Sequence, residues 1–510
     1  MTLVYGRSPC FFCGGDSVWK AGTTAEWYQG RTVSEQSGIR AGQYQSRAVS
    51  QRSSIRAGQR QGRAGHRAPD HKGKGMSMVM NERQAMAYIE GLARYGSVPG
   101  LDSIRELCRR LGDPQEKVPV IHIAGTNGKG STLAYLSAIL ESAGYRVGSY
   151  SSPAVWEYRE RFRLNRKMIA KSVFARLMER VAEAAEEMAA EGLAHPTAFE
   201  VETALAFCFF EEKKCDAAVV ETGMGGLLDA TNLIKKPLVS VLTSISMDHM
   251  QFLGKTLAEI AAQKAGIIKE GCPVVSSAQK EEAAQVIAHE AAKKHAPLYV
   301  ADVKNASGIR YGLQTQSFHY GGYRNLKISL GGVWQIENAA LAAETVHALN
   351  EHGFPIGEEA LRKGLSSAQW KGRLTVLQKK PYVIADGAHN ADAAEKLAKS
   401  LSIYFTNKPK VFIIGMLGDK DYEAVINRLA PLAQQVIAVT PPKNKRAMPA
   451  YELAQEIRKV NEHVTAADSL EEAVEMAYLL TPPDGVIVAT GSLSYLAGLE
   501  SALRNRAKHK

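Results

Sequence analysis

Residues Val118 to Leu136 read VPVIHIAGTNGKGSTLAYL, and this stretch predicts a strand, a glycine-rich loop and a helix in that order. The β-branched run at its start is typical of a buried strand, and a helical pattern begins where the glycines end. Glycines let backbone N–H groups approach a phosphate closely, a helix N-terminus adds positive potential, and Lys129 adds a full charge. The stretch therefore predicts a nucleotide-phosphate site.

The loop departs from the common phosphate-binding pattern G-x-x-x-x-G-K-[ST]. Ile123 stands at the first glycine position, and Gly130 separates Lys129 from Ser131. Taken alone, the stretch is also compatible with a glycine-rich turn that binds nothing. The choice between the two depends on the rest of the chain.

Composition favours a globular protein with several buried cores, because 45% of the 510 residues are hydrophobic and 23% are charged. No apolar run approaches the ~20 residues that span a bilayer, and the first residues lack the apolar segment of a secretory signal. We therefore expect a cytoplasmic protein that makes no membrane contact. Among the six cysteines, Cys10 and Cys13 have the spacing of metal ligands, but no second pair of ligands follows them. The other four are typical of buried thiols in a reducing compartment.

Residues 1–77 differ from the rest of the chain, because Arg, Gly, Ser and Gln dominate them. Two near-copies, SGIRAGQ at 37–43 and SSIRAGQ at 53–59, recur within this low-complexity stretch, which we expect to be disordered. It carries +8 of the net charge of +11, so the basic balance is poor evidence that the folded part binds nucleic acid. An RNA-binding or targeting arm and an extension without a role both remain open.

The remainder predicts an α/β protein with two domains. Over residues 80–366, apolar strands alternate with helical patterns around the glycine-rich loop, which indicates an N-terminal P-loop ATPase domain with a mainly parallel sheet. A hinge is expected at 370–373. Over residues 373–510, four strand–helix repeats predict a C-terminal doubly wound, Rossmann-like domain without the G-x-G-x-x-G fingerprint.

Polar side chains follow three successive strands of the first predicted domain. Ser152 follows the strand at 145–150, Glu221 follows the apolar run 217–220, and His249 follows the strand at 238–243. The carboxyl ends of parallel strands meet at one edge of a sheet, so these groups predict a metal site there. Lys264 lies among alanines in a helix expected over 257–268, and its simplest interpretation is a surface lysine.

These motifs together resemble a known family, the folylpolyglutamate synthases and bifunctional dihydrofolate synthases of the Mur ligase superfamily. The resemblance extends from about Met80 to the end, and the extension has no counterpart in it. Ten motifs occur in the family's order: GTNGKGS at Gly125, Ser-Pro at Ser152, TxFE at Thr197, ETGMGGLLDATN at Glu221, DHMQFLG at Asp248, AAQKAGIIK at Ala261, QIENA at Gln335, GR at Gly372, DGAHN at Asp386 and DKD at Asp419.

The resemblance implies an ATP-dependent ligase that adds L-glutamate to dihydropteroate, to a reduced folate, or to both. Such an enzyme forms an acyl phosphate and releases ADP and phosphate. Matching by motif implies nucleotide-binding roles for Gly125, Thr126, Asn127, Gly128, Lys129, Gly130, Ser131, Asn338, Arg373, Asp386 and His389. It also implies that Mg²⁺, as two ions, is held by Ser152, Glu221, His249 and Lys264.

Lys264 matches a lysine that is carbamylated in such enzymes, which would turn a cation into a metal-binding anion. Lys129, His249 and Lys264 would then be the catalytic set. The implied site is a cleft that closure of the two domains would complete. We also expect a monomer.

Three departures leave the substrate open, since Ala154, Leu227 and Trp334 stand where the family commonly has histidine, arginine and histidine. Two other functions compete with this interpretation. A Mur-type ligase acting on a UDP-linked peptide would need an N-terminal UDP-binding domain, which residues 1–77 cannot form. An ATPase that binds nucleic acid through the basic extension would need RNA-binding motifs in the body, and none is recognisable.

Overall fold

The computed structural model describes residues 80–96 and 100–508 of the chain. The predicted disordered extension and the Cys10–Cys13 pair lie outside the described residues. None of the helices in the described part is long and apolar enough to cross a membrane.

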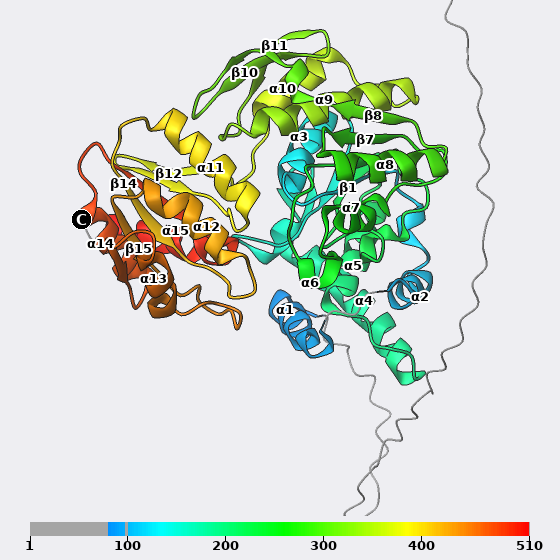
Figure 1. Ribbon diagram of the computed structural model, residues 1–510. Helices are drawn as coiled ribbons and strands as arrows, with labels where there is room; N and C mark the ends of the chain where they lie inside the picture. The colour runs from blue at the N-terminus through cyan, green and yellow to red at the C-terminus, as the bar shows by residue number, and fades with distance from the viewer. Residues whose placement is uncertain (1–79, 97–99, 509–510) are drawn as a thin grey trace, which may run out of the picture. The chain divides into compact units, whose positions relative to one another are not determined.

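The first sheet has eight strands, and the predicted nucleotide loop follows one of them. Three strands of this sheet, β1, β7 and β8, are labelled in Figure 1. Its order is β4 (Lys167–Met168), β3 (Phe162–Leu164), β2 (Val147–Tyr150), β5 (Ala217–Glu221), β1 (Val120–Ala124), β6 (Val239–Leu242), β7 (Val274–Ser277) and β8 (Leu298–Ala301). Strands β2, β5, β1, β6, β7 and β8 are parallel, and β3 and β4 add antiparallel pairs at one edge. The fold is therefore mainly parallel here, as expected.

Helices cover both faces of this sheet because its central strands are apolar on both sides. Val120 of β1 faces a core shared with α1 (Glu82–Gly91), α2 (Asp102–Arg110), α4 (Lys171–Ala190) and α5 (Ala198–Glu212). Ile121 and Ile123 face the other core, shared with α3 (Lys129–Ser142), α9 (Gln335–Glu351) and α10 (Glu358–Ser367). This alternation along a strand is the period of two that a pleated sheet imposes.

The remaining elements of this part flank the sheet. Helices α6 (Met250–Leu253), α7 (Leu257–Ala265) and α8 (Glu281–Lys293) follow β6 and β7. An antiparallel sheet of β9 (Ser307–Arg310), β10 (Gln316–Tyr320) and β11 (Tyr323–Ile328) packs against the second core. We call the first two sheets with α1–α10 the N-terminal lobe.

The third sheet forms what we call the C-terminal lobe, together with α11–α15. Its order is β12 (Thr375–Lys379), β13 (Tyr382–Ala385), β17 (Val486–Thr490), β14 (Lys410–Ile414), β15 (Gln435–Ala438) and β16 (Val464–Ala466), parallel except for β12. Helices α11 (Ala391–Tyr404), α12 (Tyr422–Leu429) and α13 (Ala450–Arg458) cover one face, and α14 (Leu470–Leu480) and α15 (Leu496–Lys508) cover the other. This is the predicted doubly wound arrangement.

Several element boundaries differ from the sequence expectation, for local physical reasons. Helix α5 begins at Ala198, because Thr197 accepts a hydrogen bond from the Glu200 backbone amide and forms a capping box. The helix expected over 257–268 ends at Ala265, where Gly266 caps it. Strands β12 and β16 lie at the sheet edges, and their sequences lack the apolar runs of the central strands.

Helix α10 packs against α3 through a glycine that leaves no room for a side chain. A Cβ on Gly364 would lie 2.6 Å from the Ile139 side chain and closer still to the Ile139 backbone. The backbone of a packed helix can shift only slightly to relieve such a contact. The contact therefore holds α3, which begins in the predicted nucleotide loop, in place.

Gly364→Ala should therefore destabilise the protein, although alanine is the better helix former. We expect a loss of about 2 kcal/mol from overpacking and a lower midpoint of thermal unfolding. Gly91→Ala is the matched control, because a Cβ on Gly91 would meet nothing within 4 Å in a helical conformation. Equal midpoints for the two variants would contradict the packing argument.

Candidate active site

The glycine-rich loop connects β1 to the start of α3, as predicted. Gly128, the residue before the helix, has φ of 95°, a left-handed conformation that a side chain disfavours. A Cβ there would also collide with the Asn338 side chain of α9. Lys129 Nζ folds back on the loop and donates to the carbonyls of Gly125 at 3.0 Å and Thr126 at 3.3 Å.

The unusual Gly130 has a tertiary explanation. It lies inside α3 without a positive φ, so the backbone does not demand glycine. The indole of Trp370, from the predicted hinge, packs so closely that a Cβ on Gly130 would lie 2.6 Å from a ring atom. The Arg163 guanidinium covers the same indole at 5.7 Å from the ring centroid. The hinge is thus packed directly on the phosphate-binding loop.

The strand-end residues meet in one cavity of about 410 Å³. The predicted residues that line it are Gly125, Thr126, Asn127, Lys129, Ser152, Glu221, His249, Lys264, Arg373 and His389. Residues from the C-terminal lobe, including Lys420, Arg446 and Ser492, complete the lining. The cavity therefore combines groups from both lobes.

Glu221 is a buried carboxylate at the end of β5, with 5% of its surface exposed. Burial raises its pKa to about 7, although Lys129, Arg373 and the backbone amide of Ser152 oppose the shift. The neighbouring positive charges do not fully offset the cost of burying the negative charge of Glu221. A cation bound in the cavity would therefore stabilise the charged form of this carboxylate.

Lys264 is not a surface residue, so its simplest interpretation from sequence was wrong. It is 4% exposed, and its Nζ donates to the Gly125 carbonyl at 2.9 Å. Burial, reinforced by the positive charge of Lys129, lowers its pKa to about 7. A substantial fraction of the amine is therefore neutral near neutral pH.

His249 follows β6 in a left-handed conformation with φ of 51°. Burial lowers its pKa to about 4, which leaves the imidazole neutral, and Lys420 contributes to the shift while Asp248 opposes it. Lys420 Nζ lies 2.8 Å from Asp248 Oδ1 and 3.1 Å from His249 Nε2. Although burial opposes it, His389 and Lys420 hold the pKa of Asp248 below its usual range.

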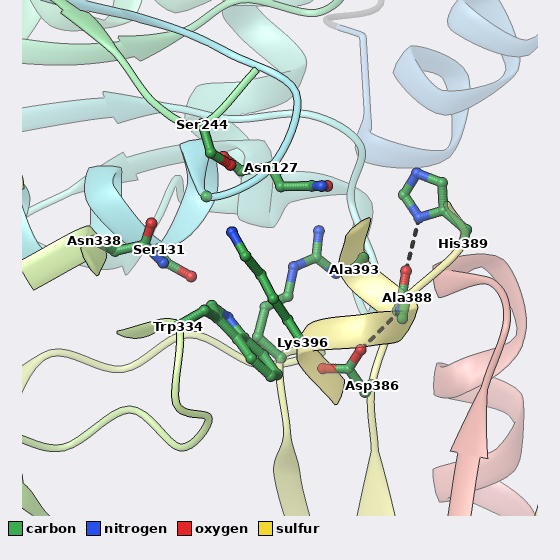
Figure 2. Close-up of a pocket in the computed structure, with 13 residues that line it drawn as sticks. Asn127, Ser131, Ser244, Trp334, Asn338, Asp386, Ala388, His389, Ala393 and Lys396 are labelled. Carbon is green, nitrogen blue, oxygen red and sulfur yellow. Dashed lines mark hydrogen bonds between the residues drawn. The ribbon is translucent and has the colours of Figure 1, made fainter. Parts of the chain in front are cut away.

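A second, narrower cavity of about 40 Å³ adjoins the loop on the side of α9 and α11 (Figure 2). Its lining includes the predicted residues Gly128, Ser131, Asn338 and Asp386, with Trp334 and Lys396. The buried Asp386 carboxylate accepts backbone hydrogen bonds from Leu374 at 2.7 Å and Ala388 at 2.8 Å. Burial raises its pKa, and Arg373 opposes the shift. Asp386 thus ties the chain after the hinge to the end of β13.

The structure brings all but one of the predicted site residues to these two cavities. Gly130 lines neither and contacts Trp370 instead. Asp248, Lys396 and Lys420 were not singled out from the sequence, although Asp248 and Lys420 lie in quoted motifs. Within residues 80–96 and 100–508, no group of three or more His, Cys, Asp and Glu side chains is placed to hold a metal ion.

Comparison with known proteins defines the class first. The model of the Mur ligase middle domain matches residues 123–346, and that of the Mur ligase glutamate ligase domain matches residues 372–493. The dihydrofolate synthase/folylpolyglutamate synthase of Bacillus subtilis is 35% identical over 434 residues, which cover 83% of this chain and 99% of that protein.

Solved structures agree with this class. Mycobacterium tuberculosis folylpolyglutamate synthase, complexed with ADP and AMPPCP, has a TM-score of 0.75 at 30% identity, covering 84% of this chain and 99% of that chain. A complex of folylpolyglutamate synthase with AMPPCP and folate has a TM-score of 0.73 at 31% identity, covering 83% and 100%. The chain belongs to the folylpolyglutamate synthase/dihydrofolate synthase family of Mur ligases, and it is an ATP-dependent ligase.

Proposed function

We propose that this ligase joins the amino group of L-glutamate to a folate-type carboxylate, that of dihydropteroate, a reduced folate, or both. The observation that carries the proposal is the cavity of about 410 Å³, which unites Lys129, Glu221 and C-terminal-lobe groups such as Arg373 and His389. The relatives support it, since one bears both activities in its name and another was solved with AMPPCP and folate. The rival functions, a UDP-peptide ligase and a nucleic-acid-binding ATPase, find no such support.

The reaction has two balanced steps. First, a carboxylate oxygen of the folate-type substrate bonds to the γ-phosphorus of ATP while the bond from that phosphorus to ADP breaks. Then the ammonium group of glutamate loses one proton, its nitrogen bonds to the acyl carbon while the bond from that carbon to the phosphate oxygen breaks, and the nitrogen gives up a second proton to solvent to leave the amide. Lys129 and the loop amides stabilise charge on the transferring group, and positioning supplies much of the rate.

Closure of the two lobes matters because water would hydrolyse the acyl phosphate. Trp370 packs on Gly130, so the hinge and the phosphate-binding loop are mechanically connected. Asp386, with Arg373 beside it, fixes the chain that follows the hinge. We propose that Asn338, Arg373, Asp386 and His389 bind the nucleotide between the lobes.

Magnesium fits the residues at the strand ends. Glu221 offers a buried carboxylate, Ser152 a hydroxyl, and His249 an imidazole that its lowered pKa keeps neutral. Carboxylate and hydroxyl oxygens suit a hard cation. We propose that these three residues hold Mg²⁺, which when bound offsets negative charge on the phosphates.

Lys264 is proposed to hold a second Mg²⁺ after carbamylation. Its amine, with a pKa of about 7, can attack CO₂, forming an N–C bond and releasing a proton. The product is a carboxylate in the cavity that Glu221 also lines.

The proposed organisation of the chain keeps the sequence-based boundaries: an extension over 1–77, an ATP-binding domain over 80–366 and a ligase domain over 373–510. We propose that the protein acts as a monomer. The four described cysteines are free thiols, which supports a reducing compartment such as the cytoplasm.

ADP release distinguishes the candidate substrates. With ATP, Mg²⁺ and L-glutamate present, we expect dihydropteroate, tetrahydrofolate or both, offered separately, to stimulate ADP formation and yield the glutamate amide. Omitting glutamate is the control. If neither pterin compound stimulates ADP release, the proposed function is wrong.

Lys129→Ala should lower turnover by at least about 100-fold, because a charge aimed at the transferring phosphoryl group is lost. The circular dichroism spectrum and unfolding midpoint should stay unchanged. Lys280→Ala, at an exposed lysine before α8, is the matched control and should retain activity. Activity retained by Lys129→Ala would contradict the role of the loop.

Carbamylation can be tested with ¹³C-labelled bicarbonate. We expect a carbamate resonance in the ¹³C NMR spectrum of the protein that is missing from Lys264→Met, because Lys264 is buried with a lowered pKa. Identical spectra for the two proteins would refute the modification.

A further inference from the structure

One face of α11 carries polar side chains that hydrogen-bond to the N-terminal lobe along the whole length of the helix. They are Asn390, Asp392, Lys396, Ser400 and Tyr404. Four of these residues, from Asp392 to Tyr404, recur every four positions and so lie on one side of the helix, and Asn390 caps its N-terminus.

The C-terminal end of this face is buried and neutral. Ser400 Oγ accepts from the Val333 backbone amide at 3.0 Å, and the Tyr404 hydroxyl donates to Gln316 Oε1 at 3.1 Å. Ser400 is 0% exposed and Gln316 1%. Breaking such bonds would leave buried polar groups without partners, so this end resists separation.

Near its N-terminal end, the same face carries a group of ionic side chains that water reaches. Lys396 Nζ lies 3.0 Å from Glu337 of α9 and 3.5 Å from Asp392. The side chains of Lys396, Asp392 and Glu337 are 22%, 33% and 39% exposed. Solvent competes with such pairs, so each contributes little alone.

This end also contacts the phosphate-binding loop, through Asp392 and through the buried amide of Asn390. Asn127 Nδ2 donates to Asp392 at 2.8 Å and to Asn390 at 3.2 Å, and Asn390 Nδ2 donates back to Asn127 at 3.2 Å and to Asp248 at 3.2 Å. Asn127 and Lys396 also line the narrow cavity beside the loop, as Figure 2 shows. If these hydrogen bonds and ion pairs break, the lining of the narrow cavity beside the loop therefore changes.

We propose that α11 is a lever, with a pivot at Ser400 and Tyr404 and a latch at Asn390, Asp392 and Lys396. Glu337 and Lys396 are positioning residues that keep the narrow cavity closed around ATP and keep water from the acyl phosphate. The role in closing the cavity around ATP rests on nucleotide binding alone. The role in keeping water from the acyl phosphate rests on the proposed function.

The test removes the ion pair that joins the latch to α9. Lys396→Met and Glu337→Gln are made singly and together, with Lys399→Met as control, since Lys399 is an exposed lysine of the same helix. Three quantities are measured: the Kd of AMPPCP, the KM for ATP against kcat, and the ratio of ADP released to amide formed. The thermal midpoint is recorded for every variant.

Each single variant should raise the Kd of AMPPCP and the KM for ATP about three- to tenfold, as expected for loss of one coupled pair. The double variant should be no worse than either single one. The ratio of ADP to amide should rise above that of the parent, because an open latch admits water, and a merely structural role would not move it. Lys399→Met should behave as the parent.

Unchanged AMPPCP binding in both single variants would overturn the latch. Additive losses in the double variant would also overturn it, because Lys396 would then act without Glu337. If AMPPCP binding weakens as expected while neither pterin compound stimulates ADP release by the parent, the latch stands and the proposed function fails.

Discussion

Charges buried together at the carboxyl edge of the first sheet constrain the rest of this structure. Glu221, Lys264 and Lys129 lie around one cavity, and burial shifts the pKa of Glu221 upward and that of Lys264 downward. Lys129 and Arg373 favour the charged form of Glu221, whereas Lys129 disfavours the charged form of Lys264, so the protein by itself balances these charges only in part. The site is therefore poised to take up phosphates and cations, which would complete the balance of charge.

The second lobe brings groups that the first sheet cannot supply. Arg373 opposes the pKa shifts of both Glu221 and Asp386, and Lys420 reaches across to Asp248 at 2.8 Å. The hinge between the lobes is not a loose connection, because Trp370 is packed on Gly130. These contacts and those of the α11 face lie at the two cavities. Movement of one lobe relative to the other would therefore change the shape of the proposed nucleotide site.

Much of the fold could be predicted because its signals are local. The β-branched run before Gly125, the four strand–helix repeats after the hinge and the polar strand ends all reflect the period and termini of elements in a parallel sheet. Strands β12 and β16 were not predicted. They lie at the edges of their sheet, where a strand is less buried and its sequence is less apolar. The roles of the predicted site residues stay predictions, although nearly all of these residues lie at the two cavities.

By itself the sequence determined the order of the central elements, the glycine-rich loop between a strand and a helix and, through ten motifs in order, the family. Spacing along a chain reports on a helix face or a strand end, where neighbours are close in sequence. Only the tertiary structure decided that Lys264 is buried, that Gly130 makes room for Trp370, and that Asn127 meets Asp392. Burial and contacts between residues hundreds of positions apart depend on how the lobes pack, and no local pattern encodes that packing.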